Sequence, residues 1–121
     1  KLNALMRPLI REEIFRRSEL LEVQKKPYII DIPLYYESEG YDCKLVVVVY
    51  APVEVQRKRL MVRENFTKEE AQKRIDAQIS IEEKKILADF LINNSFDIKF
   101  LESEIEKFIK FIRGKYANCK I

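Results

Sequence analysis

Histidine is absent from this 121-residue chain, and glycine occurs only as Gly40 and Gly114. Without histidine, the chain contains no Ser-His-Asp triad, no histidine general base and no His-ligated zinc site. Two glycines this far apart form neither the phosphate loop G-x-x-x-x-G-K-S/T nor the dinucleotide-binding loop G-x-G-x-x-G. These absences exclude several of the commonest catalytic designs from this stretch of sequence.

Cysteine and long apolar runs are also scarce. Cys43 and Cys119 have no spacing typical of a metal or redox motif, and we expect both to be reduced. No apolar run approaches the roughly 20 residues that span a membrane, and no secretory signal occurs. The net charge is only +3, and the positive residues do not cluster as in nucleic-acid-binding proteins. We therefore expect a cytoplasmic protein that binds neither nucleic acid nor membrane.

Three short runs are typical of β-strands. Residues 28–33 and 90–93 are apolar and short, and residues 44–51 contain five consecutive aliphatic residues, four of them valine. This third run is apolar on both faces, as strands in the middle of a parallel sheet are. Such a sheet needs more neighbours than this chain supplies. Either a βα unit preceding Lys1 provides them, or a second copy of the chain does.

Helical patterns fill the intervals between these runs. Apolar residues recur with helical spacing over residues 1–24, and again over about 98–112. Pro52 suits the first position of a helix that continues to about residue 64. Thr67 and Ser80 each begin a capping box, which predicts two further helix starts. Alternating strands and helices predict an α/β fold with a parallel sheet.

Arginines occur at helical spacing on the two helices that we expect around residues 57–80. Arg59 and Arg63 are four residues apart, so their guanidinium groups project from one helix face. Arg74 and Gln78 have the same spacing on the next helix. Two helices that face each other with arginines are typical of the lid of a nucleoside-phosphate kinase. The alternative is that these arginines form a solvated helix face.

Polar residues also follow two of the expected strands. Leu34 and Glu37 follow the strand at 28–33, and ligands of α/β sheets gather at the carboxyl ends of strands. Asn93 and Asn94 end the strand at 90–93, where amides offer both a donor and an acceptor to a base. Asparagine is also common in turns, and on the residues alone we favour the turn.

Taken in series, these pieces resemble the C-terminal part of dephospho-coenzyme A kinases. The resemblance extends across nearly the whole chain with natural spacing. It is carried by Leu2-Asn3-Ala4-Leu5-x-x-Pro8, Pro33-Leu34-x-x-Glu37, Gln56-x-x-Arg59-Leu60-x-x-Arg63 and Ala88-Asp89-x-x-Ile92-Asn93-Asn94.

The resemblance implies a partial three-layer phosphate-loop kinase fold with a parallel sheet and a helical lid. Residues 1–121 would be the C-terminal segment of a single kinase domain, with the lid at about 57–80. The family transfers the γ-phosphoryl group of ATP to the 3′-hydroxyl of dephospho-coenzyme A, using Mg²⁺, in the last step of coenzyme A synthesis. ATP and dephospho-coenzyme A are the implied ligands.

By the same resemblance, Arg59 and Arg63 contact phosphates, and Leu34 and Glu37 lie near dephospho-coenzyme A. Asn93 and Asn94 would lie on the adenine side of ATP, and Gln78 would also contact ATP. No metal ligand is expected within the chain. The family usually has histidine where this chain has Arg7, so no substrate contact is carried over to that position.

The phosphate loop and the catalytic base of this family precede the part that the chain resembles. We therefore expect the isolated chain to be inactive, to bind ATP weakly and to associate with itself. Two alternatives remain open from the sequence. One is a fragment of another nucleoside-phosphate kinase, and the other is a non-enzymatic α/β interaction module.

Overall fold

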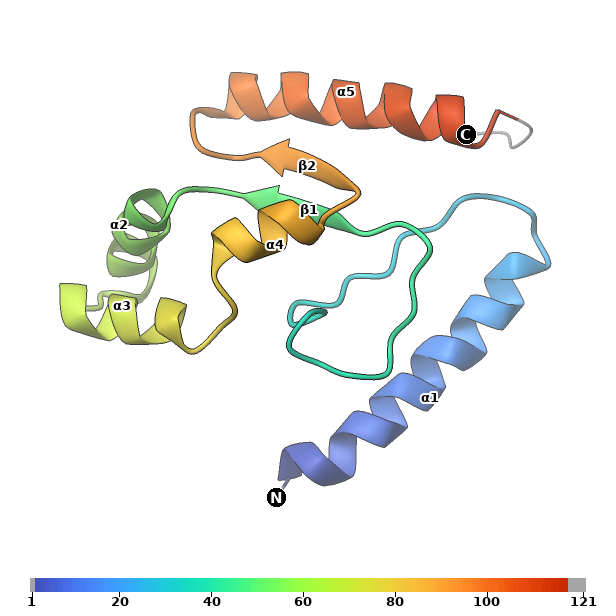
Figure 1. Ribbon diagram of the computed structural model, residues 1–121, viewed down its shortest axis with the longest axis horizontal. Helices are drawn as coiled ribbons and strands as arrows, with labels where there is room; N and C mark the ends of the chain where they lie inside the picture. Colours follow the sequence, from blue (N-terminus) through green and yellow to red (C-terminus); the bar gives the residue numbers. More distant parts are fainter. Residues whose placement is uncertain (1, 118–121) are drawn as a thin grey trace. The chain divides into compact units, whose positions relative to one another are not determined.

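The computed structural model describes residues 2–117, which form two compact units (Figure 1). Within the described residues, the first unit comprises residues 2–42 and 110–117, and the second comprises residues 43–109. Lys1 and Cys119 lie outside the described residues. The elements in chain order are α1 (Leu2–Glu22), β1 (Val47–Tyr50), α2 (Val53–Glu64), α3 (Lys68–Asp76), α4 (Ile81–Leu87), β2 (Phe90–Asn93) and α5 (Ile98–Lys115).

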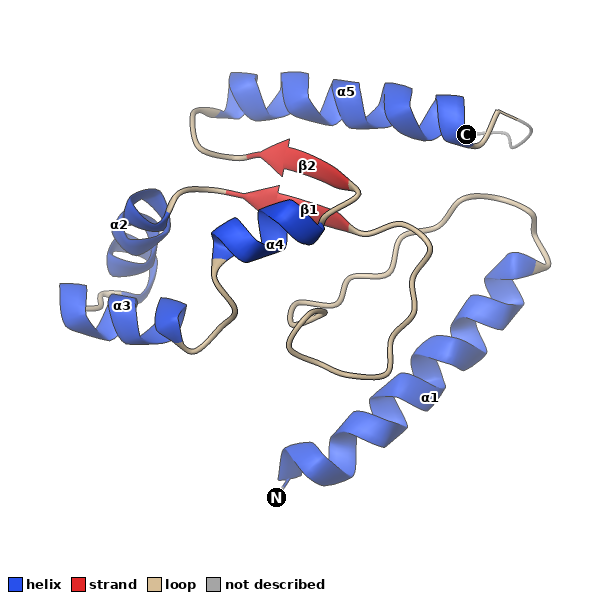
Figure 2. Cartoon of the chain, in the orientation of Figure 1, coloured by secondary structure: helices blue, strands red, loops and turns tan. Residues whose placement is uncertain are grey.

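The two strands pair in parallel, as Figure 2 shows. The register runs from Val47 opposite Phe90 to Tyr50 opposite Asn93. Asp89 closes the start of the pair, because its amide donates to the Val46 carbonyl at 2.9 Å and its carboxylate accepts from the Val46 amide at 2.7 Å. The chain between the strands forms α2, α3 and α4. The predicted α/β fold with a parallel sheet is confirmed.

The strand predicted at 28–33 is wrong. Residues 28–32 form an extended loop without strand hydrogen bonds, and a turn begins at Pro33. A strand is stabilised by hydrogen bonds to a neighbouring strand. Among the described residues β1 and β2 pair with each other in a two-stranded sheet, so residues 28–32 have no strand beside them. For the same reason β1 is shorter than predicted. Val48 is buried, but Val49 on the opposite face of β1 is 58% exposed, so one face only is covered.

Helix boundaries follow the predicted capping residues closely. The Thr67 hydroxyl accepts from the Glu70 amide, and the Ser80 hydroxyl accepts from the Glu82 amide, each at 3.2 Å. Pro52 is the N-cap of α2 and not its first helical residue, because its ψ of 153° is extended. Asn65 ends α2 in the left-handed conformation, with φ of 55°. This turn brings α3 back against α2.

The buried apolar core is small. Val48, Ala51 and Ala71 are the apolar residues classed as buried, and no large side chain in the described part of the chain is fully enclosed. No helix among these residues has the length and apolar character needed to cross a membrane.

The first unit contains α1 and the loop that follows it. Pro8 is accommodated inside α1. The Arg11 guanidinium donates to the Glu39 carbonyl at 2.6 Å and lies 5.8 Å from the centre of the Tyr41 ring. Arg11 thereby fixes the loop around Gly40, which has a φ of +96°.

Candidate functional site

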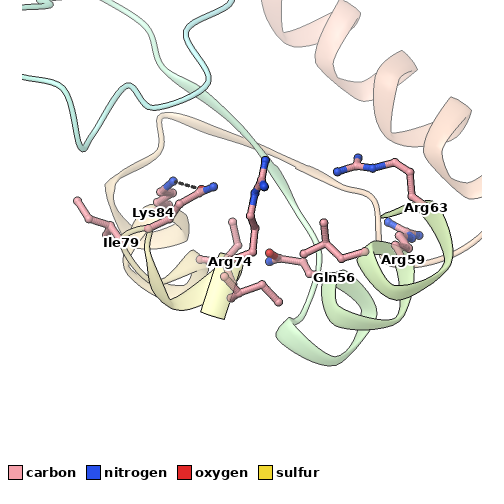
Figure 3. A pocket seen from close by; sticks show the side chains of 10 residues that line it. Gln56, Arg59, Arg63, Arg74, Ile79 and Lys84 are labelled. Carbon is pink, nitrogen blue, oxygen red and sulfur yellow. Dashed lines mark hydrogen bonds between the residues drawn. The ribbon is translucent and has the colours of Figure 1, made fainter. Parts of the chain in front are cut away.

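A pocket of about 370 Å³ opens between α2, α3 and α4 in the second unit (Figure 3). Four of its lining side chains are cationic, namely Arg59, Arg63, Arg74 and Lys84. Gln56 and Gln78 supply amides, and four aliphatic side chains complete the lining. None of the described residues that line the pocket is acidic. We call it the cationic pocket.

Helix α2 contributes Arg59 and Arg63 at the spacing that the sequence predicted. The Arg63 Nε donates to the Glu64 carboxylate at 2.9 Å, and the Arg63 side chain is 72% exposed. The two Nη groups of Arg59 donate to the backbone carbonyls of Asn94 and Phe96, at 2.6 and 3.3 Å. The first of these contacts connects α2 to a residue that is 35 positions further along the chain.

Helix α3 places Arg74 opposite α2. Arg63 from α2 and Arg74 from α3 line the same pocket, and in Figure 3 the Arg63 side chain extends toward the side on which Arg74 lies. The two helices are tied together by Arg57, whose Nη1 donates to the Gln72 side-chain oxygen at 2.8 Å. The facing arginines predicted from the sequence are therefore brought together in one pocket.

Helix α4 contributes Lys84, which sequence reasoning missed. Lys84 is only 9% exposed, and its ammonium group donates to the Gln78 side-chain oxygen at 3.3 Å. The available signal was Ile81, three residues earlier, because an apolar residue at that spacing places Lys84 on the inward helix face.

Gln56 was also missed as a lining residue. Its side-chain amide donates to the Ala51 carbonyl at 2.7 Å, which anchors the first turn of α2 to the end of β1. Nothing in its local sequence distinguishes it from an exposed glutamine.

The electrostatics of the cationic pocket favour an anionic ligand. Like charges held close together repel one another, and this repulsion falls when an anion binds between them. Arginine forks are well suited to phosphate oxygens, because they donate two parallel hydrogen bonds. The arrangement can therefore hold several phosphate oxygens at once.

Asn93 forms a turn, which was the interpretation favoured from the residues. Its side-chain oxygen accepts from the Ser95 amide at 3.1 Å and also from the Ser95 hydroxyl. The Asn94 amide donates to the Tyr50 carbonyl at 2.7 Å. A contact between these two asparagines and adenine stays a prediction, with the Asn93 amide nitrogen as its donor.

Leu34 and Glu37 belong to the first unit, so they are described separately from the cationic pocket. The Leu34 carbonyl accepts from the Ser38 amide at 2.9 Å, and the Leu34 side chain is 40% exposed. Glu37 is half-buried, and one of its carboxylate oxygens has no accessible surface. Their expected contact with substrate stays a prediction.

The described residues contain no ready-made cluster of metal ligands. Among residues 2–117, no three carboxylate, histidine or cysteine side chains cluster as metal ligands would. Mg²⁺ takes oxygen ligands, usually carboxylates together with the phosphates of its substrate.

A sequence model of the family described as "Dephospho-CoA kinase" matches residues 1–99. The chain belongs to the dephospho-CoA kinase family. The resemblance that the sequence predicted is confirmed. A curated relative from Sulfurimonas denitrificans, named dephospho-CoA kinase, is 46% identical over 120 residues, covering 99% of this chain and 60% of the relative. One from Helicobacter hepaticus with the same name is 42% identical, covering 91% and 55%.

Comparison with solved structures also finds a dephospho-CoA kinase. The dephospho-CoA kinase from Campylobacter jejuni matches with a TM-score of 0.67 at 37% identity, covering 92% of this chain and 56% of that one. The chain thus spans little more than half the length of the dephospho-CoA kinases that it matches.

Proposed function

We propose that this chain is the C-terminal, lid-bearing segment of a dephospho-CoA kinase. The whole protein would transfer the γ-phosphoryl group of ATP to the 3′-hydroxyl of dephospho-coenzyme A in the cytoplasm. The observation that carries this proposal is the cationic pocket, in which three arginines and a lysine converge without a lining carboxylate. Such a pocket suits the triphosphate of ATP better than any neutral metabolite.

The arginines would act by stabilising charge on the transferring group. Phosphoryl transfer depends on positioning and on cations around the oxygens of the reacting phosphate. Arg63 and Arg74 line the pocket from α2 and α3 and would both bind these oxygens. Arg59, one turn before Arg63, adds a third positive charge. ATP reaches such sites with Mg²⁺, whose protein ligands we place outside this chain.

The remaining predicted contacts complete the proposal. Asn93 and Asn94 would lie on the adenine side of ATP, at the end of β2, and Gln78 would bind ATP from the lining of the pocket. Leu34 and Glu37 would contact dephospho-coenzyme A. The groups that cradle the phosphates and activate the 3′-hydroxyl would come from a segment preceding Lys1.

The proposal predicts that the isolated 121-residue chain releases no ADP in a dephospho-coenzyme A-dependent assay, whereas the whole protein does. In the whole protein, Arg63→Ala should lower kcat about 100-fold, because a charged donor to the transition state is lost. Lys58→Ala is the matched control, since Lys58 is an exposed cation of the same helix that does not line the pocket.

An active isolated chain, or equal activity in Arg63→Ala and Lys58→Ala, would overturn the assignment of the site. Competition between acceptor substrates tests whether the whole protein is a dephospho-CoA kinase or another nucleoside-phosphate kinase. If the whole protein prefers a free nucleoside monophosphate to dephospho-coenzyme A as acceptor, it is another nucleoside-phosphate kinase. If it binds neither ATP nor ADP, the chain belongs to an interaction module.

A further inference from the structure

Arg59 and Arg63 lie four residues apart on α2, but their side chains have different hydrogen-bond partners. The Arg63 Nε donates to the neighbouring Glu64 carboxylate. Both Nη groups of Arg59 instead donate to backbone carbonyls, those of Asn94 and Phe96. The difference in partners indicates a difference in role.

The carbonyls that Arg59 contacts belong to the segment between β2 and α5, which we call the 94–97 loop. This loop continues directly from Asn93, where the strand ends. Its start is held by the Asn94 amide on the Tyr50 carbonyl and by the Ser95 amide on the Asn93 side chain. Arg59 adds two bonds from a different helix, and at 2.6 Å the bond to Asn94 is short.

We propose that Arg59 is a positioning residue that clamps the 94–97 loop to α2, in addition to the charge that it adds to the cationic pocket. A hydrogen bond from a charged donor is about twice as strong as one between neutral groups. The planar guanidinium presents several donors in a fixed fork, so it can reach two carbonyls and retain further N–H groups for phosphate. A lysine ammonium keeps the charge but lacks the fork.

The consequence for ligand binding rests on the proposed function, which puts adenine against Asn93 and Asn94. If Arg59 fixes the loop beside them, it contributes to binding of the base as well as the phosphates. Arg63 has no bond to the loop among those described and would contribute to phosphate binding alone. The two arginines should therefore differ in their effect on a ligand without phosphate.

Hydrogen exchange in the ligand-free whole protein tests the clamp directly. In Arg59→Lys, we expect the Asn94 and Ser95 amides to exchange about 10-fold faster than in the wild type, because the loop opens more often. The matched control is Arg63→Lys, which should leave these amides unchanged. Equal exchange in the two variants would overturn the proposal. Neither result depends on which substrate the protein uses.

A second measurement needs no variant and covers the case in which Arg59→Lys fails to fold. In the wild-type protein, the Arg59 Nη–H signals in an NMR spectrum should be resolved and protected, because two carbonyls restrict rotation of the group. The Arg63 signals should be averaged. Averaged Arg59 signals would contradict the clamp.

Calorimetry with adenosine and with ATP then tests the consequence for the base. Arg59→Lys should weaken adenosine binding about 10-fold, whereas Arg63→Lys should weaken ATP binding only. Unchanged adenosine binding in Arg59→Lys, with faster loop exchange, would overturn the role in base binding. If the wild type binds neither ligand, the proposed function fails, and the exchange experiment still decides the clamp.

Discussion

At the scale of single residues, the two glycines of the chain occupy opposite environments. Gly40 has a φ of +96°, and a Cβ built there would collide with the Arg11 guanidinium. That guanidinium is held by the Glu39 carbonyl and lies against Tyr41, so it cannot move without losing both contacts. Gly114 lies in the last turn of α5, and a Cβ there would meet nothing within 4 Å.

Substituting alanine at these positions should therefore change stability in opposite directions. Gly40→Ala should lower the free energy of unfolding by about 1–3 kcal/mol, because alanine is strained at this φ and displaces Arg11. Gly114→Ala should raise it by about 0.5–1 kcal/mol, because glycine is a poor helix former. Urea unfolding of the whole protein measures both. A Gly40→Ala variant as stable as the wild type would contradict the role of the Arg11 contact.

At the scale of elements, α1 carries an acid-sensitive group of charges. Glu13 accepts two hydrogen bonds from Arg16, at 2.8 and 2.9 Å, and one from Arg17 at 2.7 Å. The hydrogen bond from Arg16 first, and then that from Arg17, lowers the pKa of Glu13 from 4.5 to about 2. All three side chains are well exposed, so water and salt screen the interaction.

Because the pKa of Glu13 is lower in the folded helix, its carboxylate stabilises the helix at pH values above the pKa of the unfolded chain. This contribution is complete above pH 4.5 and disappears as the pH falls toward about 2. We expect the helical circular dichroism of the wild type to fall more across this interval than that of Glu13→Gln. The difference should be small, and it should shrink in 1 M salt. Identical acid titrations at low salt would show that the charges contribute nothing.

Elements also show how far the sequence specified the fold. The starts of α3 and α4 were predicted because a hydroxyl cap acts within three residues of the position it stabilises. The prediction of a strand at 28–33 was wrong because a strand depends on a neighbouring strand, whose position in the sequence no local pattern specifies. The prediction of a strand at residues 90–93 was right because β1 lies beside them and pairs with them in register.

The candidate site divides in the same way. The spacing of Arg59, Arg63 and Arg74 is local, so their convergence on one pocket was predicted. The bond from Arg59 to Asn94 spans 35 positions, and no pattern in either segment predicted it. The burial of Lys84 likewise depends on how α4 packs on the rest of the second unit. Spacing identified which residues gather, but not what each one contacts.

At the scale of the whole molecule, the described chain leaves apolar surface on its sheet. Val49 is 58% exposed on the face of β1 opposite the buried Val48. An uncovered strand with valine on both faces is a site for association with another chain. We expect the isolated 121-residue chain to associate with itself through this surface.

Light scattering over a range of concentrations tests this expectation. The isolated wild-type chain should have an average mass well above 14.5 kDa, and Val49→Lys should lower that mass toward the monomer. The matched control is Val62→Lys, which removes a similarly exposed valine, 87% exposed, from helix α2 and not from the sheet. A wild-type chain that is monomeric at every concentration would contradict the interpretation that this chain is a segment whose sheet lacks neighbouring strands.

The small core has a consequence for any measurement of stability on this chain. Three small or medium apolar side chains are buried among the described residues, and no large one there is fully enclosed. If the isolated chain associates as we expect, the surface buried between copies adds to this small core. By mass action, the unfolding midpoint then rises with protein concentration, and for a dimer a tenfold increase stabilises by about 1.4 kcal/mol. On the expectation that the isolated chain associates, its melting temperature depends on protein concentration as well as on its sequence.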